Sequence, residues 1–231
     1  MLRDRREAGR ILAQKLLHYA NRADVLVLGL PRGGVPVAAE VANALNAPLD
    51  VFLVRKLGLP GHEEIAAGAL ASGGLRVLNL PLLEMYAVTE RDMANALLRE
   101  RAELERQETT YRSDRPSLDV RGKTIILVDD GLATGSTMRA AVLALKQGRP
   151  ARIVVAVPVA PPDTCESLRG VADAVFCPVT PVPFGAVSRW YLDFDQTSDA
   201  EVLEHLRRSR RTPLHLVPVS PDQGASRKRT A

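Results

Sequence analysis

Short apolar runs alternate with amphipathic segments along most of this 231-residue chain. Runs rich in Val, Ile and Leu are typical of strands that are buried on both faces of a parallel sheet. The first and the third of these runs end directly before a Gly or an Asp, where a strand can give way to a turn. We predict strands at residues 25–28, 51–54, 124–128, 153–157 and 174–176.

The segments between these runs have the spacing of helices. Residues 5–20 and 136–147 repeat apolar side chains every three or four positions, which gives each segment one apolar face. Residues 35–46 are rich in Ala and Val and follow a pair of glycines. Because strands alternate with helices, we predict an α/β fold, a twisted parallel sheet flanked by helices.

Two stretches depart from this alternation. Residues 89–112 carry many charges and a thin apolar stripe, and Thr89 with Asp92 forms a candidate capping box. We predict a helix there that lies on, or projects from, the main body. Residues 55–88 contain five glycines and two prolines and are predicted to be broken and mobile. Together these stretches predict an accessory insertion, a mobile loop followed by a helix, at about residues 57–115.

The overall composition is that of a soluble globular protein. Apolar residues make up 46% of the chain and charged residues 25%, which excludes a disordered or fibrous chain. No run approaches the roughly 18 apolar residues of a membrane span, and the first residues lack the apolar run of a secretory signal. The two cysteines are too few for a disulfide framework. We therefore predict a cytoplasmic protein without membrane contact.

The positive charge is concentrated at the C-terminal end. The formal net charge is +4, but residues 207–231 alone hold seven basic residues and one acidic residue. The rest of the chain holds 24 basic and 26 acidic residues, which gives no support for a basic face that binds nucleic acid. Residues 212–231 have three prolines and no periodicity, so we predict a disordered basic tail behind a domain at residues 1–211. An RNA or an acidic partner is the alternative to a solvated tail.

The strongest chemical signal is residues 125–137, where a predicted strand is followed by Asp129, Asp130 and a turn of small and hydroxyl-bearing residues. Free N–H groups at the start of the next helix suit a phosphate. Adjacent carboxylates accept hydrogen bonds from sugar hydroxyls, or hold Mg²⁺ with help from ligand oxygens. The spacing points to a ribose with a 5′-phosphate; the alternative is an ordinary strand–helix turn. The turn consists of Ala133, Thr134, Gly135, Ser136 and Thr137.

This segment resembles the phosphoribosyl pyrophosphate signature of type I phosphoribosyltransferases. The resemblance implies that Asp129 and Asp130 meet the ribose hydroxyls and that residues 133–137 wrap the 5′-phosphate. Gly131 departs from the family pattern, since most members have an apolar residue there, and this loosens the turn without removing a ligand group. The turn is most similar to that of adenine and uracil enzymes. Hypoxanthine–guanine enzymes have an Asp at the position of Ala133, so their purine contact is missing here.

Two further segments fit the same ligand. Residues 29–34 place Arg32 beside the bare backbone of Gly33, which lets a pyrophosphate approach closely. The family has its pyrophosphate loop at this place. Arg55 and Lys56 end the next predicted strand and are similar to the family's basic pair, which reaches pyrophosphate oxygens; a solvated pair is the alternative. The resemblance thus makes Arg32, Arg55 and Lys56 the candidate catalytic residues.

The sequence gives weaker indications of the base-binding side. Residues 181–195 hold four of the nine aromatic residues of the chain. The segment resembles the C-terminal hood of purine phosphoribosyltransferases, in which an aromatic ring stacks on the base and a late Asp lies nearby. The candidates for contact with an acceptor base are Phe184, Trp190 and Asp193. Packing in the core is an equally good role for Trp190.

The resemblance implies an enzyme that uses phosphoribosyl pyrophosphate and Mg²⁺ to convert a nucleobase or related nitrogen acceptor to its ribonucleotide, with release of pyrophosphate. Asp129 and Asp130 would hold the metal, and the protein would be a homo-oligomer such as a dimer. The alternative is a non-catalytic regulator on the same fold that senses the donor or a nucleotide. Arg32, Arg55 and Lys56 favour catalysis, because a sensor of nucleotide alone needs no pyrophosphate clamp.

Overall fold

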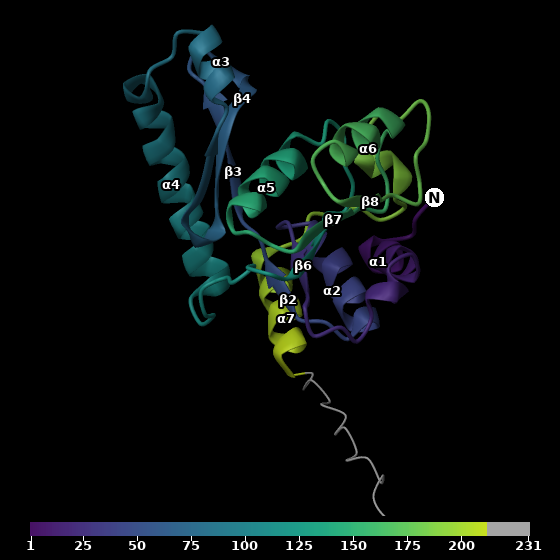
Figure 1. The fold of residues 1–231 in the computed structure, drawn as a ribbon. Coiled ribbons are helices and arrows are strands. Elements are labelled where there is room, and N and C mark those ends of the chain that lie inside the picture. The colour runs from purple at the N-terminus through teal and green to yellow at the C-terminus, as the bar shows by residue number, and fades with distance from the viewer. Residues whose placement is uncertain (212–231) are drawn as a thin grey trace, which may run out of the picture.

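A parallel five-stranded sheet forms the centre of the molecule (Figure 1), whose computed structural model describes residues 1–211. The predicted tail, residues 212–231, lies outside the described residues. The strands are β1 (Val25–Gly29), β2 (Leu49–Val51), β6 (Thr124–Val128), β7 (Arg152–Ala156) and β8 (Ala174–Phe176). Their order is β2-β1-β6-β7-β8, and every neighbouring pair is parallel. Gly29 at the end of β1 therefore lies opposite Val128 at the end of β6.

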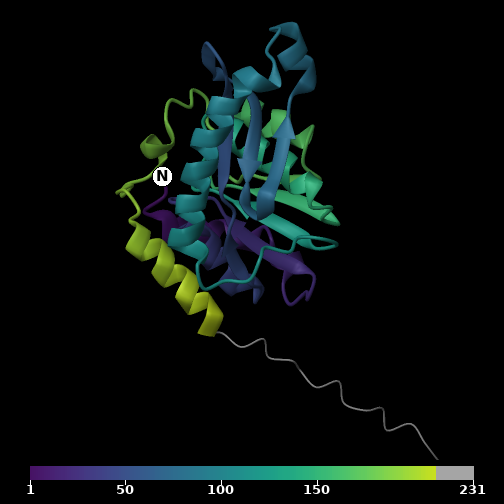
Figure 2. The ribbon, with the colours of Figure 1, turned by 90° about the vertical axis from the view of Figure 1, so that its left-hand side faces the viewer.

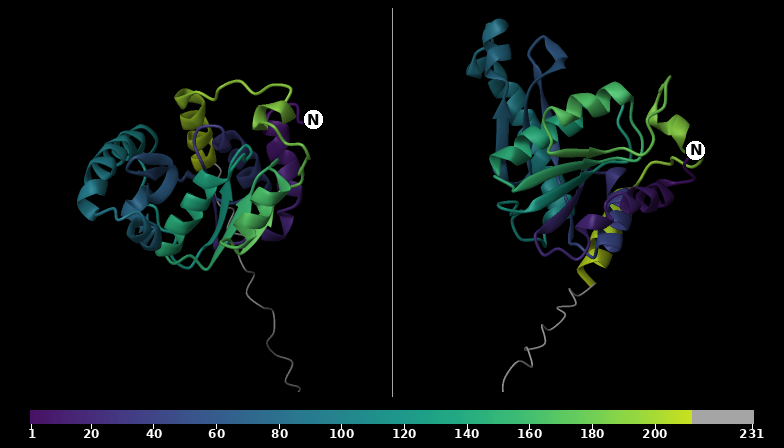
Figure 3. Two further views of the ribbon diagram at one scale, coloured as in Figure 1. Left: turned by 90° about the horizontal axis from the view of Figure 1, so that it is seen from above. Right: turned by 45° about the vertical axis from the view of Figure 1, so that its right-hand side comes forward.

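Helices cover both faces of this sheet (Figure 3). α1 (Arg5–Gln14), α2 (Gly34–Leu45) and α7 (Asp199–Arg211) lie on one face, and α5 (Ser136–Gln147) and α6 (Pro162–Arg169) on the other. Successive strand residues alternate between the two cores: Val27 and Ile126 contact the first group of helices, whereas Leu28 and Leu127 contact the second. Both faces are apolar, which explains why the central strands are nearly continuous apolar runs.

A second, antiparallel sheet forms an arm beside the main sheet. β3 (Val54–Leu59), β4 (His62–Ala71) and β5 (Leu75–Leu78) make up this sheet, and α3 (Leu80–Met85) and α4 (Glu90–Arg112) follow it. α4 runs along the sheet of the arm (Figure 2), and its Met93 packs on Leu57 and Leu59 in a core separate from the other two. Among residues 1–211, no helix is both long enough and apolar enough to cross a bilayer.

Most of the predicted elements are confirmed. α5 has the predicted bounds, and α4 begins at the predicted capping box, in which Thr89 and Asp92 each accept a hydrogen bond from the other's backbone N–H. The predicted helix at residues 5–20 is shorter, because α1 ends at Gln14 and a 3₁₀ turn follows. The predicted strand at residues 51–54 is wrong in part: β2 ends and β3 begins within it, since the chain there passes from one sheet to the other.

The glycine-rich segment at residues 55–88 is a sheet with a short helix and not the broken segment that its composition predicted. Three of its five glycines lie in the turns of the sheet, and the other two, Gly58 and Gly68, lie within β3 and β4. Gly61, with φ of 79°, lies between β3 and β4, and Gly73 and Gly74, with φ of 76° and 73°, lie between β4 and β5. Glycine adopts these backbone angles without a steric cost. The mobility of the segment stays a prediction.

A buried cluster of charges connects the end of the arm to the main sheet. Asp50 on β2 forms ion pairs with Arg112, at the end of α4, at 2.5 Å and with Arg115 at 3.1 Å. The arginine side chains are each 7% exposed and the Asp50 side chain is 14% exposed. Arg115 also donates hydrogen bonds to the carbonyl oxygens of Leu49 and Leu206. Since buried charges must be paired, Asp50 fixes where α4 ends relative to β2.

We expect Asp50→Ala to lower the free energy of unfolding by about 3–5 kcal/mol, because it removes the carboxylate that pairs with the buried guanidinium group of Arg112 and takes one ion pair from Arg115. Urea unfolding followed by circular dichroism measures this change. Glu105→Ala is the matched control on α4, since the Arg101–Glu105 pair is exposed and such pairs contribute little. Equal unfolding midpoints for the two variants would contradict the role given to Asp50.

Candidate functional site

The carboxyl ends of β1 and β6 bring two of the predicted motifs together. The strands are neighbours and parallel, so the loop after β1 (residues 30–33) and the segment after β6 (residues 129–135) leave the same edge of the sheet. Ligands of open parallel sheets bind at this edge. The first loop leads into α2 and the second into α5, so each of them ends at the N-terminus of a helix.

Asp129 and Asp130 lie side by side and are partly buried. Burial, followed by the charge of Asp130, raises the pKa of Asp129 well above its usual value. Burial also raises the pKa of Asp130, although the guanidinium group of Arg5 opposes this shift. Arg5 Nε donates a hydrogen bond of 2.8 Å to Asp130 Oδ2, and the backbone N–H of Asp130 donates one of 2.9 Å to Asp129 Oδ1. The pair is therefore short of positive charge and of hydrogen-bond donors.

The loop after β1 packs directly on these carboxylates. A Cβ atom built on Gly33 would lie only 2.0 Å from Asp130 Oδ2, so a side chain there must displace the carboxylate. A Cβ on the next residue, Gly34, would lie 2.8 Å from the carbonyl oxygen of Val128. The glycine pair, predicted as an open approach for a pyrophosphate, is thus also the contact surface between the two motifs.

The predicted phosphate turn opens α5. Ala133, Thr134, Ser136 and Thr137 are exposed, whereas Gly135 is buried with φ of 70° and immediately precedes the helix. The N-cap is Gly135, which has no side chain to cap the helix, and the N–H of Ser136 donates only a long hydrogen bond of 3.4 Å to Thr134 Oγ1, so the N-terminus of α5 suits an anion. Thr164 of α6 donates a hydrogen bond of 2.8 Å to the carbonyl oxygen of Ala133 and supports the turn from behind.

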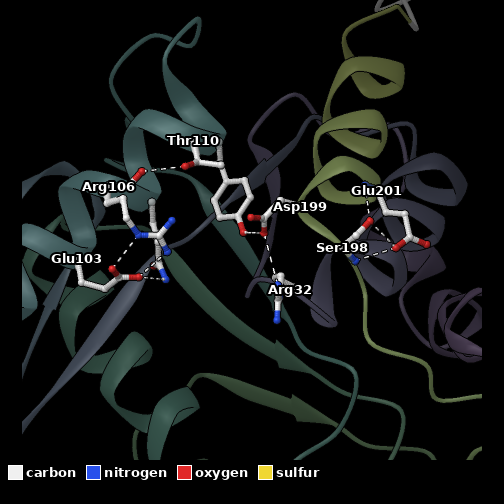
Figure 4. Close-up of polar contacts among 9 residues, drawn as sticks. Arg32, Glu103, Arg106, Thr110, Ser198, Asp199 and Glu201 are labelled. Carbon is white, nitrogen blue, oxygen red and sulfur yellow. Dashed lines mark hydrogen bonds and ion pairs between the residues drawn. The ribbon is translucent and has the colours of Figure 1, made fainter.

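Arg32 contacts α7 through a carboxylate. Its Nη1 lies 3.8 Å from Asp199 Oδ1, and the hydroxyl of Tyr111, at the end of α4, donates a hydrogen bond of 2.5 Å to the same oxygen (Figure 4). Burial, followed by this hydrogen bond to Asp199, raises the pKa of Tyr111. Asp199, on α7, therefore links Arg32 of the predicted pyrophosphate loop to Tyr111 of α4.

Arg55 and Lys56 line a cavity of about 720 Å³ beside the strand ends, together with Thr137 of the phosphate turn. Arg55 also forms an ion pair with Glu100 on α4: its Nε and Nη2 both lie 2.8 Å from Glu100 Oε2. The structure thus brings the predicted basic pair and the predicted phosphate turn to one cavity. Arg32 does not line it.

Two of the predicted base-binding residues, Phe184 and Trp190, lie in a separate apolar cluster. Phe184 and Trp190 stack on each other with ring centroids 6.4 Å apart, and Trp190 Nε1 donates a hydrogen bond to the carbonyl oxygen of Phe184. Asp193 is exposed, and its carboxylate accepts a hydrogen bond from the backbone of Asp195. None of the three predicted residues lines the 720 Å³ cavity. Their contact with a base stays a prediction.

Residues 181–195, the hood segment, contact the acidic motif through other side chains. The Tyr191 hydroxyl donates a hydrogen bond of 2.5 Å to the carbonyl oxygen of Asp130. A Cβ on Gly131 would lie 2.5 Å from Val187 Cγ1 and 3.0 Å from Val159 Cγ1. Two valines therefore fill the space that an apolar side chain at position 131 would take, which explains the departure from the family pattern.

Three residues of the site were missed from the sequence: Arg5, Tyr191 and Asp199. Arg5 and Asp130 are 125 positions apart, and neither residue stands in a spacing pattern that links them. Arg5 also lies over the ring of Phe194 at 4.0 Å and donates a hydrogen bond to the carbonyl oxygen of Asp195. A cationic residue early in the chain gives no signal of such contacts in the sequence. These contacts form only when the hood segment has folded back against α1.

Comparison with known proteins places this arrangement in a family. Residues 3–189 match the model of the phosphoribosyl transferase domain. Two Mycobacterium tuberculosis proteins, from strains H37Rv and CDC 1551, are named as candidate phosphoribosyl transferases. Each is 44% identical over 208 residues, which are 90% of this chain and 47% of the relative. The chain thus spans about half the length of these curated relatives.

Further similarities concern a solved structure and a group of regulators. The crystal structure of TT1426 from Thermus thermophilus is 42% identical with a TM-score of 0.83 and covers 90% of this chain and 98% of its own. The bifunctional protein PyrR of Chloroflexus aurantiacus is 39% identical over 129 residues, 54% of this chain and 65% of the relative. A shorter match, 52% over 52 residues (22% of this chain and 28% of the relative), is to a pyrimidine operon regulatory protein of Lactococcus lactis.

The raised pKa of Asp129 predicts a change of stability with pH. Above about pH 4, the usual Asp value, the unfolded chain has released a proton that the folded protein still binds. Stability contributed by this proton is therefore lost as the pH rises through the raised pKa. In metal-free buffer at pH 7.5, Asp129→Asn should raise the free energy of unfolding by roughly 1–3 kcal/mol, the cost of a buried unsatisfied group.

Urea unfolding at pH 7.5 and pH 4 measures this effect, and the gain should nearly vanish at pH 4. Asp163→Asn is the control, since Asp163 is exposed on α6. A lower stability of Asp129→Asn at pH 7.5 would contradict the assignment of a buried, unfavourable charge.

Proposed function

The chain belongs to the phosphoribosyl transferase domain family, and we propose that it transfers the phosphoribosyl group of phosphoribosyl pyrophosphate to a nitrogen acceptor. The new bond joins C1 of the ribose to a ring nitrogen of a nucleobase or a related acceptor. The bond from C1 to the pyrophosphate oxygen breaks, and the acceptor nitrogen loses its proton. The observation that carries this proposal is the contact between the buried Asp129–Asp130 pair and the glycine loop at the start of α2.

The donor's sugar and phosphate match the two halves of the β6–α5 segment. Buried carboxylates short of hydrogen-bond donors gain from the 2′- and 3′-hydroxyls of a ribose, which would donate to Asp129 and Asp130. The N–H groups at the start of α5 and the hydroxyls of Thr134, Ser136 and Thr137 suit the 5′-phosphate. One ligand would thus supply hydrogen-bond donors to the carboxylates of Asp129 and Asp130 and an anion to the N-terminus of α5.

The leaving pyrophosphate would be bound by Arg32, Arg55 and Lys56. Negative charge grows on this group as the bond to C1 breaks, so contacts that strengthen at that moment lower the barrier. Asp129 and Asp130 are oxygen donors of the kind that Mg²⁺ takes. Residues 1–211 hold no cluster of three or more metal-binding side chains, so the remaining ligands of Mg²⁺ would be donor oxygens and water. When bound, Mg²⁺ would neutralise pyrophosphate charge.

The acceptor would be held by the hood segment, residues 181–195. Phe184 and Trp190 stack on each other, so they would offer one aromatic surface to a base and not two independent ones. Asp193 is exposed near them in sequence and would accept a hydrogen bond from the acceptor. We further expect a homo-oligomer, such as a dimer, in the cytoplasm.

A regulator that binds the donor without turnover is the second candidate. The names of the Chloroflexus and Lactococcus relatives favour it, since one is called bifunctional and the other an operon regulatory protein. The basic residues after position 206 are where such a protein would contact RNA or an acidic partner. A screen of nucleobases with phosphoribosyl pyrophosphate and Mg²⁺, followed by pyrophosphate release, separates the two candidates. Tight donor binding with no turnover for any base would favour the regulator.

Phosphoribosyl pyrophosphate with Mg²⁺ should raise the melting temperature, because a ligand that binds the folded state stabilises it by mass action. A donor concentration of about 100 times its Kd contributes roughly 2.7 kcal/mol. Replacement of both Asp129 and Asp130 by Asn should abolish the shift while the protein stays folded. Differential scanning fluorimetry measures both. A wild-type protein with no shift at millimolar donor would overturn the proposed function.

Arg55→Ala should slow nucleotide formation by about 100-fold or more, since one charge-assisted contact to the leaving group is worth roughly 2–4 kcal/mol of barrier. Affinity for ribose 5-phosphate, which lacks the pyrophosphate, should barely change. Single-turnover kinetics beside a ribose 5-phosphate titration measure the two effects. Equal losses in both would mean that the Arg55–Glu100 pair supports the fold and not the reaction.

A further inference from the structure

The 720 Å³ cavity is enclosed on one side by α4, an element that no motif of the sequence assigns to ligand binding. Its other walls are the start of the loop after β1, the basic pair on β3 and the turn between β3 and β4. Figure 2 shows α4 running along the sheet of the arm, from the tip of the arm towards the main sheet. On α4 the lining residues are Asp92, Asn95, Ala96, Arg99, Glu100 and Gln107.

These residues recur every three or four positions, so they form one face of α4. The two acidic residues in the lining are already engaged. Asp92 accepts hydrogen bonds from the backbone and hydroxyl of Thr89 in the capping box, and Glu100 pairs with Arg55. Arg99 has no such partner: its guanidinium group makes no ion pair or hydrogen bond with the described residues. It therefore adds a positive charge that no acidic lining residue balances.

The position of this charge indicates what the cavity binds. Arg99 lines the same cavity as Arg55 and Lys56 of β3, and Thr137 brings the phosphate turn to its edge. Cations on two facing elements, with a helix N-terminus beside them, attract an anion with several oxygen acceptors. An inorganic pyrophosphate has this chemistry, and it would lie between β3 and α4 with contacts to both.

We propose that Arg99 of α4 is a further binding residue for the pyrophosphate end of the donor, so that α4 is one wall of the leaving-group site. The proposal rests on the proposed function and deepens it. It adds a residue from the arm helix to the cations of the β1 loop and of β3. It also gives the accessory arm a role in the reaction, since β3 and α4 would contact the leaving group from opposite sides.

Isothermal titration with inorganic pyrophosphate and Mg²⁺ tests the proposal. Arg99→Gln should raise the Kd for pyrophosphate about tenfold or more, as expected for the loss of one charge-assisted contact. Arg101→Gln is the matched control, because Arg101 lies two positions away, outside the cavity, and pairs with Glu105. Its Kd should stay within about twofold of the wild type. Arg99→Lys should recover most of the affinity, and the effect of Arg99→Gln should shrink in 0.5 M salt.

Ribose 5-phosphate is the second probe and should bind all variants equally. Equal pyrophosphate affinity of Arg99→Gln and Arg101→Gln would overturn the role of Arg99 and leave the proposed function standing, provided that the wild type binds pyrophosphate. A parallel loss of ribose 5-phosphate affinity in Arg99→Gln would also overturn it, since the residue would then support the whole site. A wild type that binds neither probe would overturn the proposed function together with this inference.

Discussion

Two carboxylates, Asp129 and Asp130, are held side by side at the end of the buried strand β6. The free-energy cost of ionising both of them is the constraint on which the rest of the site depends. Each has a pKa raised by burial, so the ionised pair is unfavourable in the protein alone. Arg5 compensates part of that charge with a hydrogen bond of 2.8 Å. Gly33 packs so closely on the pair that a Cβ there would lie 2.0 Å from Asp130 Oδ2. Binding of a sugar or a cation to the pair is therefore favourable, because the ligand supplies hydrogen-bond donors or positive charge to carboxylates that the protein alone compensates only in part.

The cations of the proposed leaving-group site are held in a different way. Arg55 pairs with Glu100 and Arg32 with Asp199, and all four side chains are about one-quarter to one-half exposed. Exposed ion pairs contribute little to stability, so each arginine can exchange its carboxylate for a more highly charged anion at a small cost. The hydrogen bond from Tyr111 to Asp199 joins the helices that supply these carboxylates.

The sequence was sufficient to predict the elements that depend on interactions between residues close together in the chain. The central strands β1 and β6 are nearly continuous apolar runs, α5 begins at Ser136 within the phosphate turn, and the capping box of Thr89 marks the start of α4. The arm's sheet was missed because its glycines lie both in the turns and within the paired strands, and that pairing is a tertiary property. The partners of the predicted site residues were missed for the same reason. Asp199 and Arg5 lie far along the chain from Arg32 and Asp130, and only folding brings them into contact.

Several residues that contact the predicted site lie beyond the match to the family model. Tyr191, Phe194 and Asp199 lie beyond residue 189, where the match to the family model ends, yet they contact Asp130, Arg5 and Arg32. Val187, near the end of the match, fills the space above Gly131. With this valine in place a Cβ at position 131 would lie 2.5 Å from its Cγ1, so the packing of the hood segment on the turn requires a glycine there. Under the proposed function, the donor would therefore be bound within the matched residues, while residues of the hood segment and α7 beyond the match would position Asp130, Arg5 and Arg32.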